Sequence, residues 1–417
     1  MKLAHRLAVL LVGVAVVASA CGGVAAPSPS ASGSASVAPA AKTVKIWSSL
    51  PMTGASRTQT VQIVNAINMA LDEINRKIGT TTIEFEALDD ATAAKQSWDA
   101  AQESENAKKA IADKRTVAYI GTFNSGAAKV SIPLLCQASI VMISPANTYP
   151  GLTKPGKGEA DEPMKYYPSC THNYFRVVPA DDIQGAVGAV WIKELGAKKT
   201  YIVHDTQLYG KGIADVFRAK AKEIGLAEAG YEGADKADNY KALANKIKES
   251  GADSVYYGGI VDQNPAVLLK DVRVVLPNII FMGPDGINCS EFLKAAGPAA
   301  EGGKTYSTFG GLPPEKYSGK TSDWLTRYKA KFGGGNPDAY AVYGYEAALT
   351  AIAAIKTAGD KADDKATVLK NVAATKDFDG VLGKWSFDVN GDTSLTTMSG
   401  TVAEKGEWKF VKELAAK

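Results

Sequence analysis

Hydrophobic positions in the first part of the chain follow two periods in turn. Short apolar or alternating runs predict buried strands at residues 43–49, 83–87, 116–121 and 139–144. After the first run, apolar residues recur every three or four positions and predict an amphipathic helix with Ile63, Ile67, Ala70, Ile74 and Ile78. Further helices are predicted through Trp98 and Ile111 and from Ser125 to about Gln137. This βαβαβαβ order predicts a parallel sheet with helices on its faces.

A second series of the same kind follows a polar insertion at residues 151–173. Strands are predicted at 200–205, 227–231, 254–260 and 279–284, with helices near 182–195, 212–224, 238–249 and 264–273. After residue 305 we expect one strand, helices near 316–331, 339–357 and 364–373, and a terminal β-hairpin with Lys405 and Gly406 at its tip. A chain of 417 residues is long enough for two lobes of this α/β class.

Two loops of the first series carry small polar residues where strands end. One loop places Ser125 and Gly126 at the start of a helix, and the other leaves Ala146, Asn147 and Thr148 after Pro145. In a parallel sheet both loops lie at the carboxyl edge, where open α/β sheets bind ligands. N–H groups at a helix start suit a carboxylate or phosphate, and a carbonyl with a hydroxyl can receive an ammonium. The pair of loops indicates a receptor for an α-amino acid, although Ser125 can equally be an ordinary helix cap.

Composition excludes several classes of function. With 46% hydrophobic and 22% charged residues and a formal charge of 47 − 44 = +3, the chain is typical of a globular protein without a nucleic-acid surface. There is no CxxC motif, and His5, His172 and His204 are scattered, so we expect no metal site and no cofactor. No GxSxG motif accompanies Ser125, so we expect no enzymatic activity.

The first 42 residues predict export. Residues 1–20 have a basic start and an apolar run typical of a signal peptide, and Cys21 follows small residues as in the lipobox of bacterial lipoproteins. We therefore expect lipidation of Cys21, a disordered tether over residues 21–42, and an extracytoplasmic, membrane-anchored protein. Ala18 departs from the leucine usual in a lipobox, so a conventional signal peptide is the alternative.

A series of short motifs gives the chain its family resemblance. In order they are LPMTG, ALDEIN, the SG of FNSGAA, MISPANT, NYFRVVPADD, HDTQLYGKG, GADSVYYGG, FMGPDG and DAYAVYGYEAA. Together they resemble the branched-chain amino acid type of substrate-binding protein from ABC importers, a class I periplasmic-binding-protein fold, over residues 44–414. The resemblance implies two lobes, 43–179 plus 309–379 and 180–308 plus 380–417, joined by crossings near Pro179, Thr308 and Gly380. It also implies a monomer that closes on a ligand in the cleft between the lobes and delivers it to a membrane permease.

The resemblance assigns roles to single residues. Ser125 and Thr148 match groups that bind the ligand carboxylate, and the Ala146 carbonyl and Thr148 hydroxyl match groups that receive the ammonium. Asp285 matches an acidic residue that neutralises the ammonium, although it can also simply shape a turn. Tyr209 and Tyr340 match aromatic residues of the pocket, and the alternative for both is an ordinary aromatic of the core or the surface.

The chain also departs from the pattern of this family. Arg57 and Gln59 lie where a branched-chain receptor has tyrosine, Ile260 replaces another tyrosine, and Asn124 replaces a small apolar or cysteine residue. We therefore expect a more polar pocket lined by Asn124, Arg57 and Gln59, although Arg57 can also be a solvated surface residue. The alternatives for function are a sensor of the same fold, or a receptor for a small amide or aromatic acid.

Three cysteines remain after Cys21. Cys136 and Cys170 fall in the first lobe, and Cys289 follows the Asp285 turn in the second. We hypothesise a Cys136–Cys170 disulfide, because export permits disulfides and an odd number leaves one thiol unpaired.

Overall fold

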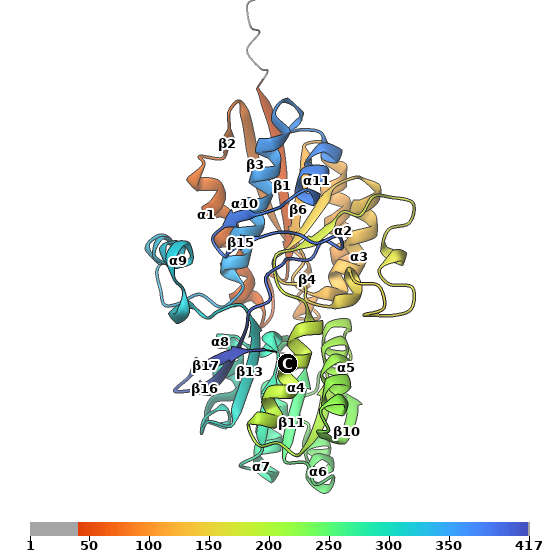
Figure 1. Cartoon of the computed structure of the whole chain (residues 1–417), viewed down its shortest axis with the longest axis vertical. Helices are drawn as coiled ribbons and strands as arrows, with labels where there is room; N and C mark the ends of the chain where they lie inside the picture. Colours follow the sequence, from red (N-terminus) through yellow and green to blue (C-terminus); the bar gives the residue numbers. More distant parts are fainter. Residues whose placement is uncertain (1–40, 416–417) are drawn as a thin grey trace, which may run out of the picture. The chain divides into compact units, whose positions relative to one another are not determined.

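The computed structural model describes residues 41–415. They form two α/β units, each built on its own sheet (Figure 1). The predicted signal peptide, Cys21 and nearly all of the tether lie outside the described residues. We refer to each sheet, with the helices packed on it, as a lobe.

The first lobe contains a six-stranded sheet in which all pairs except β2–β3 are parallel. Its strands, in spatial order, are β2 Lys77–Ile78, β3 Thr81–Asp89, β1 Lys42–Leu50, β6 Thr116–Gly121, β7 Val141–Ser144 and β8 Tyr174–Arg176. Its helices are α1 Arg57–Glu73, α2 Ala100–Ala112, α3 Ser125–Gln137, α9 Gly319–Phe332, α10 Ala341–Ala358 and α11 Lys365–Ala373.

Alternating side chains of these strands enter two different cores. Ile46 and Ile120 pack with α1, α10 and α11, whereas their neighbours Trp47 and Tyr119 pack with α2 and α3. A strand places successive side chains on opposite faces, so a sheet covered on both sides needs apolar residues at both. This explains why the central strands β6 and β7 are largely apolar in the sequence.

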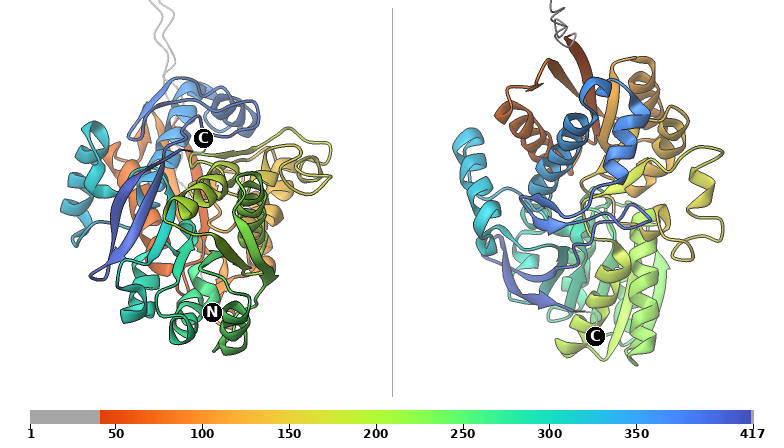
Figure 2. Two further views of the ribbon diagram at one scale, coloured as in Figure 1. Left: turned by 60° about the horizontal axis from the view of Figure 1, so that its bottom comes forward. Right: turned by 45° about the horizontal axis from the view of Figure 1, so that its top comes forward.

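The second lobe contains a seven-stranded sheet, parallel from β10 to β13 and antiparallel beyond. Its strands, in spatial order, are β10 Ala227–Gly233, β9 Lys199–His204, β11 Ser254–Gly258, β12 Ile280–Gly283, β13 Thr305–Gly310, β16 Met398–Glu404 and β17 Glu407–Leu414. Its helices are α4 Asp181–Glu194, α5 Leu208–Glu223, α6 Lys241–Glu249, α7 Pro265–Val275 and α8 Ser290–Ala296. Figure 2 shows the C-terminal hairpin, in dark blue, beside the teal strand β13.

The end of the chain joins the second sheet later than predicted. We expected the third crossing near Gly380, but Val381 and Trp385 are buried in the first core. Two short strands, β14 Phe378–Gly380 and β15 Gly383–Trp385, form a hairpin there, and the chain enters the second sheet only at Met398. Glu346 of α10 holds this hairpin, because its carboxylate accepts hydrogen bonds from the Val381 N–H at 2.8 Å and the Trp385 indole at 2.5 Å.

The helix α1 ends earlier than its apolar period predicted. It stops at Glu73, and Asn75 and Arg76 both have φ of 53°, which reverses the chain. Ile78 therefore lies in the edge strand β2 rather than on the helix. The predicted tip of the terminal hairpin is present, with φ of 54° at Lys405 and 74° at Gly406.

Cys136 of α3 and Cys170 of the polar insertion form the disulfide that we hypothesised, with their Cα atoms 5.8 Å apart. Cys289 has a free, buried thiol.

Candidate functional site

The start of α3 presents unpaired N–H groups to the carboxyl edge of the first sheet. The helix follows β6, and the Asn124 carbonyl accepts the N–H groups of Ala127 and Ala128, each at 3.1 Å. The preceding N–H groups, of Ser125 and Gly126, have no partner within a helix and point out of its end. Ser125 is 2% exposed, and its hydroxyl accepts the Tyr149 N–H at 3.4 Å. This arrangement forms an anion-binding corner with one hydroxyl in it.

Trp98 covers this corner and leaves room only for glycine at position 126. A Cβ at Gly126 would lie 2.5 Å from the Trp98 ring. The indole N–H of Trp98 donates to the Gln207 side chain, at the start of α5 in the second lobe, at 2.8 Å. The glycine thus lets an aromatic ring close one side of the site.

The turn after β7 forms the next part of the first-lobe wall. The Ser144 hydroxyl accepts the N–H groups of Ala146 and Asn147, at 3.1 and 2.8 Å, and so fixes the turn. Thr148 is 2% exposed, and its carbonyl accepts the N–H of Asp181 at 2.9 Å. Ala146 and Thr148 line the same cavity as Ser125.

The second lobe brings a carboxylate to the opposite wall. Asp285 follows β12 after one intervening residue, at the start of a 3-10 turn, and one of its oxygens accepts the Tyr209 hydroxyl at 2.7 Å. Its other oxygen accepts the hydroxyl of Tyr340, which belongs to the first lobe, so this bond joins the two lobes. Burial raises the pKa of Asp285 above its ordinary value, and the two tyrosine hydroxyls oppose that rise.

One small cavity brings the predicted residues together. Its volume is about 20 Å³, and it is lined by Phe123, Asn124, Ser125, Ala146, Thr148, Tyr209, Ile260, Asp285, Gly286 and Tyr340. Seven of the nine residues that we predicted to bind ligand are among them. Six of the seven lie in the loops or helix starts that follow the carboxyl ends of parallel strands, where open α/β sheets bind ligands, whereas Tyr340 directly precedes α10.

Phe123 and Gly286 were not predicted, and Ile260 was noted only as a departure from the family pattern. Phe123 and Gly286 directly adjoin Asn124 and Asp285 in the sequence, so adjacency was the signal available for them.

Arg57 and Gln59 do not line this cavity, contrary to our expectation. Arg57 is exposed, whereas Gln59 is 2% exposed. Residues two positions apart on an α-helix point about 200° apart, so the two side chains cannot share one pocket. The start of α1 is held instead by Asp262 of the second lobe, which accepts the Ser56 N–H at 3.0 Å and also the Ser56 hydroxyl.

A second buried carboxyl group lies behind Thr148. Asp181 begins α4 and is fully buried, and neither of its oxygens has a hydrogen-bond partner among the described residues. Burial, and then the charge of Asp285, raise its pKa well above the ordinary value. Asp181 stands in the NYFRVVPADD motif, but we did not single it out from the sequence as a site residue.

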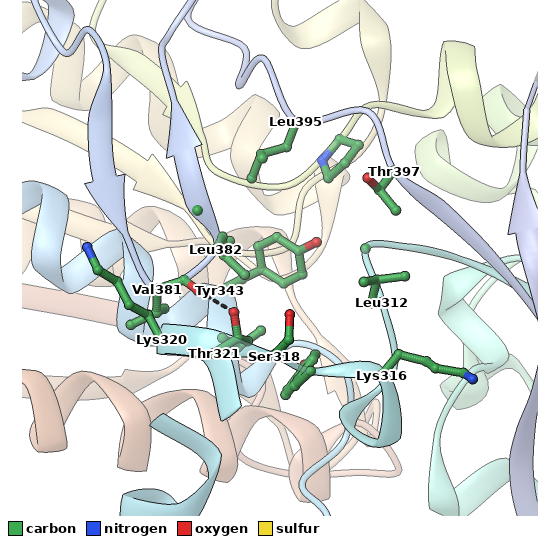
Figure 3. Close-up of a pocket in the computed structure, with 15 residues that line it drawn as sticks. Leu312, Lys316, Ser318, Lys320, Thr321, Tyr343, Val381, Leu382, Leu395 and Thr397 are labelled. Atoms are coloured by element: carbon green, nitrogen blue, oxygen red, sulfur yellow. Dashed lines mark hydrogen bonds between the residues drawn. The ribbon is translucent and has the colours of Figure 1, made fainter. Parts of the chain in front are cut away.

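A larger cavity of about 300 Å³ lies where the chain passes between the two sheets (Figure 3). Pro179, Gly311 and Thr397, one residue from each crossing, contribute to its lining. Figure 3 shows Tyr343 in its middle, between Leu395 and Ser318. None of the predicted ligand-binding residues lies there.

Within residues 41–415, no group of three or more His, Cys, Asp or Glu side chains is placed to hold a metal ion. In the same part of the chain, we find no helix with the length and apolar character of a membrane span.

Two sheets with a cavity between their carboxyl edges define a two-lobed α/β binding protein. A family model described as "Periplasmic binding protein" matches residues 43–406, and the chain belongs to this family.

Similar proteins agree with this assignment. Leu/Ile/Val-binding protein homolog 1 of Brucella melitensis is 29% identical over 350 residues, which cover 83% of this chain and 86% of that protein. The structure of leucine binding protein LivK from Thermotoga maritima has a TM-score of 0.77 at 24% identity, covering 89% of this chain and 99% of that one. A solute binding protein of an ABC transporter from R. palustris, solved with benzoate, has a TM-score of 0.74 at 18% identity, with coverages of 89% and 96%. The structural likenesses confirm the predicted fold class.

Proposed function

We propose that this protein is the extracytoplasmic solute-binding component of an ABC importer and binds an α-amino acid between its lobes. The observation that carries the proposal is that one cavity receives a helix start from the first sheet and a carboxylate from the second. The relatives named for leucine, isoleucine and valine binding support the same class of ligand.

An α-amino acid carries a carboxylate and an ammonium, and this cavity has groups suited to each. Its carboxylate fits the N–H groups and hydroxyl at Ser125, where the helix dipole favours negative charge. Its ammonium fits Asp285, with the Ala146 carbonyl and Thr148 hydroxyl as further acceptors. A buried charge without a partner costs several kcal/mol, so the carboxylate and the ammonium of the ligand each need partner groups in the cavity.

Binding requires the lobes to move. A volume of about 20 Å³ holds about one water molecule, so an amino acid enters only after the walls separate. The bonds from Tyr340 to Asp285 and from Ser56 to Asp262 join the lobes and must break during opening. Hinge closure around a ligand is the motion known for proteins of this architecture.

Delivery to a permease explains the predicted export signal. A lipidated Cys21 followed by a flexible tether would keep the binding lobes close to a membrane-embedded partner. The lipid anchor, the permease, the monomeric state and the lack of catalysis remain predictions. Copurification with a permease, rather than with a signalling protein, would separate an importer from a sensor of the same fold.

Calorimetry with freshly purified protein tests the ligand class. We expect one or more of the standard amino acids to bind, and the matching 2-oxo acids, which lack the ammonium, to bind far more weakly. Native mass spectrometry of the same sample would identify a solute carried through purification. Binding of benzoate or another acid without an amino group, and of no amino acid, would overturn the proposal.

A further inference from the structure

Asn124 places an unpaired amide oxygen at the wall of the ligand cavity. The residue is 5% exposed and lines the cavity, and its Oδ1 has no hydrogen-bond partner among the described residues. Burying an amide oxygen without a hydrogen-bond partner is unfavourable, so the position costs stability unless something binds to it.

The usual reason for an asparagine at this position does not apply. Asn124 is the N-cap of α3, where asparagine commonly accepts an N–H of the first turn, yet its side chain makes no such bond. Other helices of the same chain are capped in the usual way: Asp99 accepts two N–H groups at the start of α2, and Asp364 accepts one at the start of α11. The amide of Asn124 is therefore not used by its own helix, although the residue lines the cavity.

The cavity lining also contains apolar side chains. Phe123 and Ile260 line the same cavity, and the rings of Phe123 and Tyr340 meet edge to face with centroids 5.5 Å apart. The ionisable carboxylate in the lining is Asp285, which the ligand ammonium engages in the proposed function. Arg57 is exposed and outside the lining, so it offers no counter-charge to an acidic side chain.

We propose that Asn124 selects amino acids whose small side chain is uncharged and carries a hydrogen-bonding hydroxyl or amide group. The inference rests on the proposed function, because it assumes that the α-amino and α-carboxyl groups are held by Asp285 and Ser125. An aliphatic side chain would leave the amide of Asn124 buried without a partner, whereas a hydroxyl or carboxamide supplies one. The specificity thus differs from the one named for the leucine, isoleucine and valine binding relatives.

Pairs of amino acids with the same shape test the inference directly. Asparagine and leucine branch alike, as do threonine and valine, and the members of each pair differ mainly in hydrogen-bonding capacity. By calorimetry we expect the polar member of at least one pair to bind about tenfold more tightly, or better, than its apolar partner. Equal or tighter binding of leucine and valine would overturn this inference and leave the proposed function standing. Failure of every α-amino acid to bind would overturn both.

Asn124→Leu replaces the amide by an apolar group of the same branched shape. We expect it to remove or reverse the preference within each pair, while Asn239→Leu, at an exposed position of the second lobe, leaves the preference unchanged. Asn124→Ala provides a second variant if the leucine side chain impairs folding, which a thermal melt of each protein would reveal. A uniform loss of affinity for both members of each pair would show that Asn124 does not contact the ligand side chain.

Discussion

The two walls of the ligand cavity are built from different kinds of groups. The first lobe contributes a helix start and a turn, with backbone N–H groups, one carbonyl and the hydroxyls of Ser125 and Thr148. The second lobe contributes the carboxylate of Asp285 and the hydroxyl of Tyr209, which donates a hydrogen bond to that carboxylate. One wall is suited to an anion, and the other offers a negative charge to a cation. The first lobe offers an ammonium only neutral acceptors, and the counter-charge comes from the second lobe, so full binding of an amino acid requires the lobes to close.

Removing the charge of the second wall should have the largest effect on binding. Asp285→Asn preserves the shape of the side chain, and loss of one partner of a buried charge pair costs about 2 to 5 kcal/mol. We therefore expect the affinity for the amino acid, measured by calorimetry, to fall by roughly 30-fold to several-thousand-fold.

Asp338→Asn is the control for this variant, because Asp338 also joins the lobes, through Ser290, but lies outside the cavity lining. If the affinity of Asp285→Asn for the amino acid is within threefold of that of the unmodified protein, Asp285 only shapes its turn. The second wall then offers no charge to the ligand.

Changing the first wall should have a smaller effect, because its donors belong mainly to the backbone. Ser125→Ala removes one hydroxyl but leaves the N–H groups at the start of α3, so we expect a loss of about 1 to 3 kcal/mol in binding. Ser131→Ala is a matched control on the same helix, since the Ser131 hydroxyl donates to the Ala127 carbonyl rather than facing the cavity. An equal loss in both variants would indicate a general effect on the helix.

Acidification should weaken binding through the second wall. Burial raises the pKa of Asp285 above its ordinary value, and only the ionised form attracts an ammonium. As pH falls through that raised pKa the carboxyl group becomes neutral, and affinity should decrease by about tenfold per pH unit below it. Burial also raises the pKa of the adjacent Asp181, so the Asp285→Asn variant is needed to separate the two. A pH profile that is identical with and without Asp285 would assign the titration to another group.

Weakening a contact between the lobes outside the cavity should change affinity least and leave selectivity intact. Ser56→Ala removes a hydroxyl that donates to Asp262 across the lobes, while the Ser56 N–H remains bonded to Asp262. We expect a uniform loss of about 0.5 to 1.5 kcal/mol for all ligands, because only closure is affected. A loss that differs between ligands in calorimetry would mean that the variant has altered the walls themselves.

Much of the cavity could be predicted because its loops obey a rule of topology. Ser125, Tyr209 and Asp285 each follow a parallel strand whose centre is apolar, so the positions of those strands were readable from the sequence. Once the strands are placed in parallel sheets, the loops at their carboxyl ends must meet at one edge.

Other features depend on contacts that leave no local signal. The directions in which the Arg57 and Gln59 side chains point depend on Ser56, the residue before α1. Asp262 of the other lobe fixes the position of Ser56. The hydrophobic pattern marks Val381 and Trp385 as buried but does not say in which core, so the third crossing was placed too early. The apolar period of α1 continued to Ile78 although two residues of positive φ had already ended the helix.

The cavity among the three crossings also makes the protein a candidate optical sensor. Segments at Pro179, Gly311 and Thr397 line it and must bend when the lobes move, so its volume follows the angle between the lobes. Thr397 is exposed at its rim, and the described cysteines are either joined in a disulfide or buried, as Cys289 is. An environment-sensitive dye attached to a Thr397→Cys variant would report ligand capture by a change in fluorescence without touching the ligand.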